Sequence, residues 1–166
     1  LPSVYQTSYP YCFRCPYRQD PASCRRPCFS ELETIIMRRI PADEIAAVII
    51  EPVLGEGGYV PAPPSFLAAL RVFCDRHGIL LVFDEVQSGM GRSGRWFACE
   101  HSGVSPDIMT VAKGIASGYP LSAVVAKKEI MEQWPSGAHG TTFGGNPVSC
   151  AASMATIDVI REEGLL

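Results

Sequence analysis

Residues 79–87 read ILLVFDEVQ: five apolar side chains in a row, followed by the carboxylate of Asp84. Residues 106–114 read PDIMTVAKG, a second apolar run that ends at Lys113. Short apolar runs of this length, ended by polar residues, are typical of strands buried in a parallel sheet. The two runs therefore predict neighbouring strands whose polar residues meet at one end of the sheet.

Further runs extend this pattern along the chain. Residues 46–50 and 121–126 are apolar and β-prone, so each predicts another strand, and 46–50 is expected to be buried on both faces. Ser30 followed by Glu33 is a capping-box pattern at the start of a helix. Helices are expected from Ser30 to Ile40, from Pro63 to His77, from Lys127 to Trp134 and, with an amphipathic pattern, from about Val148 to Glu163. This alternation predicts an α/β fold, with a mostly parallel sheet and helices on both faces.

Length and composition limit the class of protein. The 166 residues suffice for one ordinary domain, and a net charge of −3 offers no basic surface for nucleic acid. No apolar run approaches the length of a membrane span. Seven cysteines without a signal-peptide pattern favour a reducing compartment, the cytoplasm. The chain has no starting Met, so we interpret it as an internal piece of a longer protein.

Two parts of the chain differ in composition. Residues 1–29 lack a helical or strand period and predict an irregular arm rich in Cys and Pro. Residues 30–166 hold the predicted strands and helices and are expected to be incomplete at both ends. Within this part, Cys74, Cys99 and Cys150 lie in apolar or helical contexts and are predicted to be buried thiols.

Polar residues stand at three strand ends: Glu51, Asp84 and Lys113. Because ligands of parallel sheets bind beyond the carboxyl ends of the strands, these side chains are expected to face one site. An amine beside a carboxylate is what pyridoxal phosphate requires, since the amine forms a Schiff base with its aldehyde and the carboxylate pairs with its protonated ring nitrogen. Taken singly, Lys113 could be a solvated surface lysine, and Asp84 could cap a helix or pair with a basic side chain.

Four motifs together resemble one family. They are FDEVQSGMGRSG at 83–94, IEPVLGEGG at 50–58, AKG with GYPL within 112–121, and GTTFGGNP at 140–147. In this order and spacing they resemble the class III, or ω-, aminotransferases. The segment SYPYCFRC at 8–15 is similar to the 4-aminobutyrate aminotransferase-like branch, which also holds acetylornithine-type enzymes and amino-acid racemases.

The resemblance implies a fold and a set of roles. Residues 30–166 would be part of the large, cofactor-binding domain of a type I pyridoxal-phosphate-dependent transferase. Lys113 would form the Schiff base and move the proton, and Asp84 would pair with the ring nitrogen. Val86 would pack on one face of the ring, and Gln87 would bind its phenolic oxygen. Thr142 would reach the cofactor phosphate of a neighbouring subunit, which implies a homodimer with a shared active site.

The implied reaction moves an amino group from an amino acid or an ω-amine such as 4-aminobutyrate to a 2-oxo acid. Glu51 resembles the glutamate that pairs with a substrate-binding arginine in this family. Alternatives within the family are an amino-acid racemase and an enzyme like dialkylglycine decarboxylase. Arg92 could close the site or cap a loop. Since the expected phosphate loop and substrate arginine are not in these residues, we expect the 166 residues alone to be inactive.

The arm carries an alternative of another class. The spacings Cys12-x-x-Cys15 and Cys24-x-x-x-Cys28 are compatible with a tetrahedral zinc site. Such a site would make the protein a zinc-stabilised binding module. The main interpretation assigns no metal, because Pro and Arg crowd this segment and the resemblance implies no required metal. A binding module would also have no use for Asp84, Gln87, Lys113 and Thr142.

Overall fold

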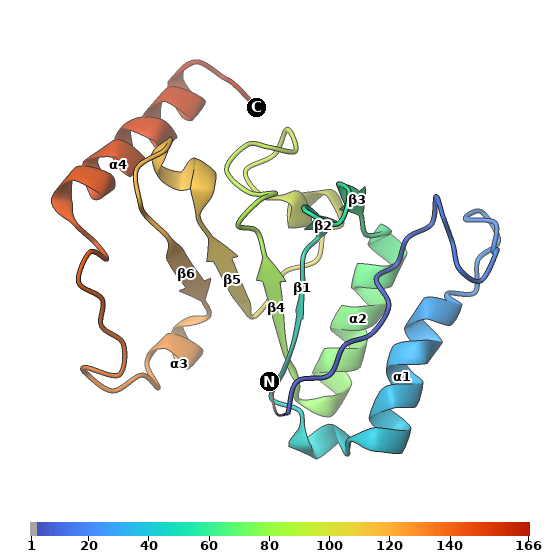
Figure 1. Cartoon of the computed structure of the whole chain (residues 1–166). Helices are drawn as coiled ribbons and strands as arrows, with labels where there is room; N and C mark the ends of the chain where they lie inside the picture. The colour runs from blue at the N-terminus through green and yellow to red at the C-terminus, as the bar shows by residue number, and fades with distance from the viewer. Residues whose placement is uncertain (1–2) are drawn as a thin grey trace.

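A four-stranded sheet with the strand order β1-β4-β5-β6 forms the centre of the molecule. The computed structural model describes residues 3–166, so the first two residues of the expected 1–29 arm lie outside the described residues. The strands are β1 (Ala47–Ile50), β4 (Leu80–Asp84), β5 (Ile108–Val111) and β6 (Ala123–Ala126). The pairs β1–β4 and β4–β5 are parallel, and β6 is antiparallel to β5. The predicted α/β fold, a mostly parallel sheet flanked by helices, is confirmed (Figure 1).

Helices and a small hairpin surround this sheet. The helices are α1 (Pro27–Arg39), α2 (Pro64–His77), α3 (Lys128–Met131) and α4 (Pro147–Glu162). Three 3₁₀ turns are η1 (Ala42–Glu44), η2 (Ala98–His101) and η3 (Lys113–Ala116), and the hairpin pairs β2 (Val53–Leu54) with β3 (Val60–Pro61). Figure 1 shows α1 and α2 side by side on one side of the sheet, and α4 beyond β6. There α4 packs against η3.

The hydrophobic core lies between the sheet and the pair α1–α2. Its most buried members include Phe66, Leu67, Leu70 and Cys74 of α2, and Leu81 and Phe83 of β4. Phe29 of α1 contacts the rings of Phe66 and Phe73 edge-on, with centroids 5.6 and 6.0 Å apart. Pro64 begins α2 and the left-handed Gly78 ends it, as the sequence predicts, so the helix presents its apolar face to β4.

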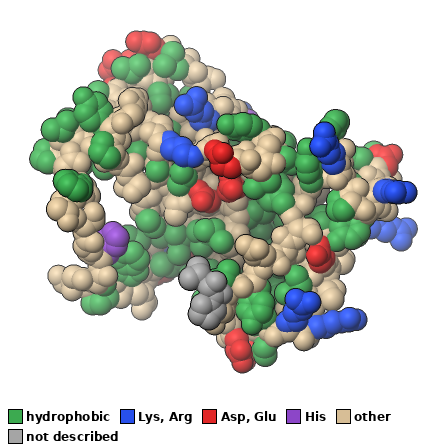
Figure 2. All heavy atoms as spheres, viewed as in Figure 1, with side chains coloured by type: hydrophobic (Ala, Val, Ile, Leu, Met, Phe, Trp, Pro, Cys, Tyr) green, Lys and Arg blue, Asp and Glu red, His purple; other side chains and the backbone are tan. Residues whose placement is uncertain are grey.

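The expectation that residues 46–50 are buried on both faces is wrong. Val48 and Ile50 pack against the core, whereas Ile49 is 65% exposed. Alternate side chains of a strand point to opposite faces, and α1 and α2 cover only the face that carries Val48 and Ile50. Figure 2 shows hydrophobic side chains gathered on the face in view, where Figure 1 places the strands β4 to β6.

The predicted capping box of α1 is also wrong. The helix begins at Pro27, three residues before Ser30, and no side chain caps it. Ser30 lies inside the helix, where its carbonyl accepts a hydrogen bond from Thr34 Oγ1 at 2.7 Å. Proline at the first helical position, with its fixed φ, sets the start in place of a polar cap.

The last two helices differ in detail from the prediction. Of the helix expected at 127–134, only α3 is α-helical, and the chain then continues in turns toward Pro135. The helix α4 is capped by Asn146, whose side chain accepts from the Ser149 N–H at 2.9 Å. Its fully buried residues, Ser149 and Ser153, are small and polar, and η3 packs against this helix. Ala152, Ile157 and Ile160 are half-buried on the same side, whereas Val148, Met154 and Val159 are exposed, so only part of the expected apolar face is buried.

The arm is attached to the rest of the molecule through Tyr9. Its hydroxyl donates to the Glu51 carbonyl at 2.9 Å, with the Pro52 and Val60 carbonyls within 3.3 Å. Burial, the largest cause, raises the pKa of Tyr9. The adjacent Pro10 is buried. Among the described helices, none is long and apolar enough to cross a membrane.

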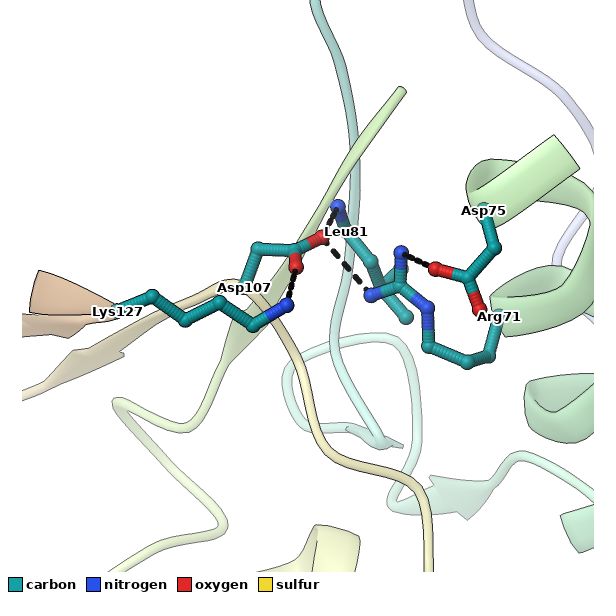
Figure 3. Close-up of polar contacts among 5 residues, drawn as sticks. All are labelled: Arg71, Asp75, Leu81, Asp107 and Lys127. Carbon is teal, nitrogen blue, oxygen red and sulfur yellow. Dashed lines mark hydrogen bonds and ion pairs between the residues drawn. The ribbon is translucent and has the colours of Figure 1, made fainter. Parts of the chain in front are cut away.

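A buried aspartate joins the elements at the amino ends of β4 and β5 (Figure 3). Asp107 accepts from the Leu81 N–H and from Arg71 of α2, both at 2.8 Å, and it pairs with Lys127 at 2.6 Å. Burial opposes the charge of Asp107, but the Leu81 N–H, Lys127 and Arg71 outweigh it and lower the pKa of this carboxyl. The network fixes α2, β4, β5 and the end of β6 relative to one another.

We expect Asp107→Asn to lower the free energy of unfolding of the full-length protein by about 1–3 kcal/mol at pH 7, because it weakens charge-assisted hydrogen bonds from the Leu81 N–H and Arg71 to a buried carboxylate. A lowered folded-state pKa stabilises the protein above the ordinary value of 3.8, and this stabilisation is lost as the pH falls through the folded pKa. The difference in the free energy of unfolding between wild type and variant should therefore shrink as the pH falls through the folded pKa of Asp107. Denaturant unfolding at several pH values measures it. Asp75→Asn, at the exposed ion pair of Arg71, is the control, with a cost below about 1 kcal/mol.

Candidate active site

A cleft of about 520 Å³ lies at the carboxyl ends of the parallel strands. It is lined by residues of the β2–β3 hairpin, of the loop after β4 and of the start of η3: Val53, Gly55, Glu56, Tyr59, Gln87, Ser88, Arg92, Ser93, Lys113 and Gly114. Figure 2 shows acidic and basic side chains side by side at this end of the sheet. A second hollow of about 370 Å³ lies between α1 and α2 and contains none of the sequence-predicted site residues.

Lys113 enters the cleft from the first position of η3. Its Nζ donates a hydrogen bond to Gln87 Oε1, so the amine is directed at the loop after β4. Its backbone is left-handed, with φ +48°, a conformation that costs energy for a residue with a Cβ. Gly114 permits this turn, since a Cβ there would lie 3.1 Å from Cβ of Met90. The Lys113 side chain is exposed among the described residues.

Asp84 is the last residue of β4 and is half-buried. Its Oδ1 accepts from the Val86 N–H at 3.0 Å, which orients the carboxylate by a turn of its own chain. Within residues 3–166, Asp84 forms no ion pair and caps no helix, so neither of the simpler alternatives applies. Asp84 does not line the cleft but lies next to it, beside β5.

Gln87 connects the two sides of the cleft. Its amide Nε2 donates to Glu56 Oε1 at 3.3 Å and to the Tyr59 hydroxyl at 3.4 Å, while its Oε1 accepts from Lys113. Gly55 makes room for this amide, because a Cβ at that position would lie 2.9 Å from Gln87 Cδ. The glutamine is therefore held between the hairpin and the lysine rather than free in a turn.

Of the remaining predicted residues, Val86, Glu51 and Thr142 lie outside the cleft lining. Val86 is half-buried in the turn that follows Asp84. Glu51 Oε2 accepts from the Gly55 N–H at 2.8 Å and so closes the turn before the hairpin. Thr142 is exposed in the connection between α3 and α4, which Figure 1 shows outside β6. Arg92 does line the cleft, and among the described residues it forms no ion pair.

A fully buried glutamate that sequence reasoning missed supports the loop. Glu85 follows Asp84 and accepts from the Ser88 hydroxyl, from the Ala98 N–H at 3.0 Å and from the Cys99 N–H at 2.8 Å. These bonds tie the start of the loop to η2, so Gln87 and Arg92 project from a fixed base. Its position as a charged residue close to the end of a buried strand could have indicated a structural role for Glu85.

The cysteines fall into two groups. Cys74 and Cys99 are buried as predicted, and burial, then the Glu85 carboxylate, raises the pKa of Cys99 to about 12. The prediction for Cys150 is wrong, since it is only half-buried at the start of α4.

The arm holds the other group, Cys12, Cys15, Cys24 and Cys28, all half-buried free thiols. Burial raises the pKa of Cys12, and the neighbouring Cys24 and Cys15 raise it further. Across residues 3–166 no group of three or more His, Cys, Asp or Glu side chains is placed to hold a metal ion.

Comparison with known proteins places this site in a family. The family model for aminotransferase class-III matches residues 1–166. The chain belongs to the class-III aminotransferases. It is 44% identical to a leucine/methionine racemase from Thermococcus litoralis over 100% of this chain and 38% of that protein. It is 42% identical to a 4-aminobutyrate aminotransferase from Mycobacterium leprae over 99% of this chain and 37% of that protein.

Solved structures of this family share the fold. An amine transaminase from an uncultivated Pseudomonas species, in its PLP-bound form, matches with a TM-score of 0.85 and 40% identity over 94% of this chain and 37% of that one. This class-III chain thus spans little more than a third of the length of these relatives. The family and the PLP-bound relative indicate pyridoxal phosphate as the cofactor.

The residues present fit this cofactor. Lys113 offers a primary amine in the cleft, and Asp84 offers a carboxylate with one oxygen that takes no hydrogen bond from the described residues. Gln87 offers an amide next to the Lys113 amine. An amine, a carboxylate and an amide at the carboxyl ends of two adjacent parallel strands are the donor set that the aldehyde, ring nitrogen and phenolic oxygen of pyridoxal phosphate need.

Proposed function

We propose that the protein containing this chain is a pyridoxal-phosphate-dependent transaminase that moves an amino group from an amino acid or ω-amine to a 2-oxo acid. The observation that carries the proposal is the contact between Lys113 and Gln87 in the cleft, with Asp84 at the end of the adjacent strand. Family membership supports it.

The chain's own residues divide the work. When bound, the cofactor supplies an electron sink for the bond that breaks at the substrate carbon. Lys113 binds the cofactor through its amine and later carries a proton between the substrate carbon and cofactor C4′. Asp84 holds the proton on the ring nitrogen, and Gln87 binds the phenolic oxygen. Val86, apolar and β-branched, packs on one face of the ring.

Two further roles concern the substrate and the assembly. Glu51 is proposed to pair with a substrate-binding arginine contributed from outside these residues. Thr142, exposed on the α3–α4 connection, is proposed to bind the phosphate in a partner subunit, which makes the active enzyme a homodimer with a shared site. All seven cysteines are free thiols, as in a reducing compartment, and we propose that the enzyme acts in the cytoplasm.

A racemase of the same family is the second candidate. The leucine/methionine racemase matches this chain over its whole length, including the cysteine-rich arm. Incubating the full-length enzyme with a single amino-acid enantiomer separates the two functions. A transaminase needs a 2-oxo acid and yields a new one, whereas a racemase inverts the enantiomer without an acceptor.

Borohydride reduction tests the cofactor and the lysine together. The full-length protein is incubated with excess pyridoxal phosphate, reduced and digested, and its peptides are weighed by mass spectrometry. We expect a phosphopyridoxyl group on Lys113. Lys127 and Lys128, the other lysines of this chain, are internal controls and should stay unlabelled. An unlabelled Lys113, with the cofactor in excess, would refute the proposed function and indicate a family member without catalytic activity.

A further inference from the structure

Thr110 carries a buried hydroxyl without a partner. In residues 3–166 its Oγ1 is inaccessible to water and forms no hydrogen bond. It is the one polar side chain in β5, whose other residues are Ile108, Met109 and Val111. Leaving a buried hydroxyl unsatisfied costs about 1–3 kcal/mol, and valine has the same shape without this cost. A group that meets this hydroxyl in the complete protein is therefore expected.

The register of the sheet shows which group lies nearest. Thr110 is directly opposite Asp84 in the parallel pair β4–β5, and the Glu85 N–H donates to the Thr110 carbonyl at 3.0 Å. Adjacent strands lie about 4.8 Å apart. Phe83 and Met109, the preceding pair, face the core, so Asp84 and Thr110 share the opposite face.

We propose that Thr110 is a positioning residue for Asp84: its hydroxyl donates to the Asp84 carboxylate when the cofactor is bound in the complete protein. This inference rests on the proposed function. The Val86 N–H already orients Asp84 Oδ1 from one side. The Thr110 hydroxyl adds a second fixed donor from the neighbouring strand and leaves the carboxylate a lone pair for the ring N–H. Two donors on separate elements hold a carboxylate in one orientation better than one does.

Two variants of the full-length protein test this role. Thr110→Val removes the hydroxyl and keeps the shape, and Thr110→Ser keeps the hydroxyl. We expect Thr110→Val to raise the Kd of the apoprotein for pyridoxal phosphate about tenfold, the loss of one hydrogen bond to a charged group, measured by absorbance titration. Thr110→Ser should stay within about threefold of wild type. Thr34→Val, which removes an exposed hydroxyl on α1, is the matched control and should not change Kd.

Two readouts separate positioning from a purely structural role. The melting temperature of the Thr110→Val apoprotein should equal or exceed that of wild type, because an unsatisfied hydroxyl is removed. In an Asp84→Asn background, Thr110→Val should no longer change Kd, since the partner is gone. The inference is overturned if Thr110→Val binds as wild type does, if Thr110→Ser weakens binding equally, or if the two substitutions act additively. Wild-type protein that fails to bind pyridoxal phosphate would instead refute the proposed function itself.

Discussion

Replacing Lys113 with alanine in the full-length protein is expected to lower kcat by about 10⁴-fold or more. The proposal gives this amine two tasks, holding the cofactor and moving the proton, and each is lost with the side chain. Of the chain's three lysines, only Lys113 lies in the cleft. Steady-state kinetics of the overall amino transfer measure the effect.

The control for this prediction is Lys128→Ala. Lys128 is exposed on α3 and pairs with Glu132 one helical turn away, a contact of a few tenths of a kcal/mol. Its variant should retain wild-type turnover. Since Lys113 is exposed and, among residues 3–166, its side chain hydrogen-bonds only to Gln87, Lys113→Ala should unfold at a similar temperature. Turnover above about 1% of wild type would remove Lys113 from both tasks.

Local sequence signals predicted the elements around the site well. Continuous apolar runs identified β4 and β5, and the proline and glycine signals identified both ends of α2. They also placed Glu51, Asp84 and Lys113 correctly at the carboxyl ends of β1, β4 and β5. Each of these features depends on contacts within a few residues or on strand length, which the sequence displays directly.

Features that depend on distant segments were not predictable. Ile49 is exposed because α1 and α2 cover the other face of the sheet. The periodicity of a strand does not show which of its faces a helix will cover. The start of α1 is a different kind of error, because the signal was local: Ser30 resembled a cap, while Pro27, three residues earlier, is the first residue of the helix.

Within the site, too, the contacts between distant segments could not be predicted from the sequence. The resemblance brought Gln87 and Lys113 into one site, but not the bonds of Gln87 to Glu56 and Tyr59 across the hairpin. The placement of Thr110 beside Asp84 required the strand register, which no single strand encodes.

Asp84→Asn in the full-length protein is expected to lower kcat by about 10²–10³-fold while leaving the borohydride label on Lys113. A neutral amide does not hold the proton on the ring nitrogen, so the electron sink at the substrate carbon weakens. The amine of Lys113 is unaffected by this change, so cofactor attachment should persist. Kinetics and peptide mapping on the same preparation measure both effects.

The structure also predicts that this variant folds. Asp84 forms no ion pair within the described residues, and its one hydrogen bond, from the Val86 N–H, can be accepted equally by the side-chain oxygen of asparagine. The melting temperature of Asp84→Asn should therefore match that of Asp75→Asn, a control at an exposed aspartate of α2 that should keep full turnover. Near-normal turnover would exclude Asp84 as the ring-nitrogen partner. A label lost together with turnover, even with cofactor in excess, would show instead that turnover is lost because the cofactor no longer attaches.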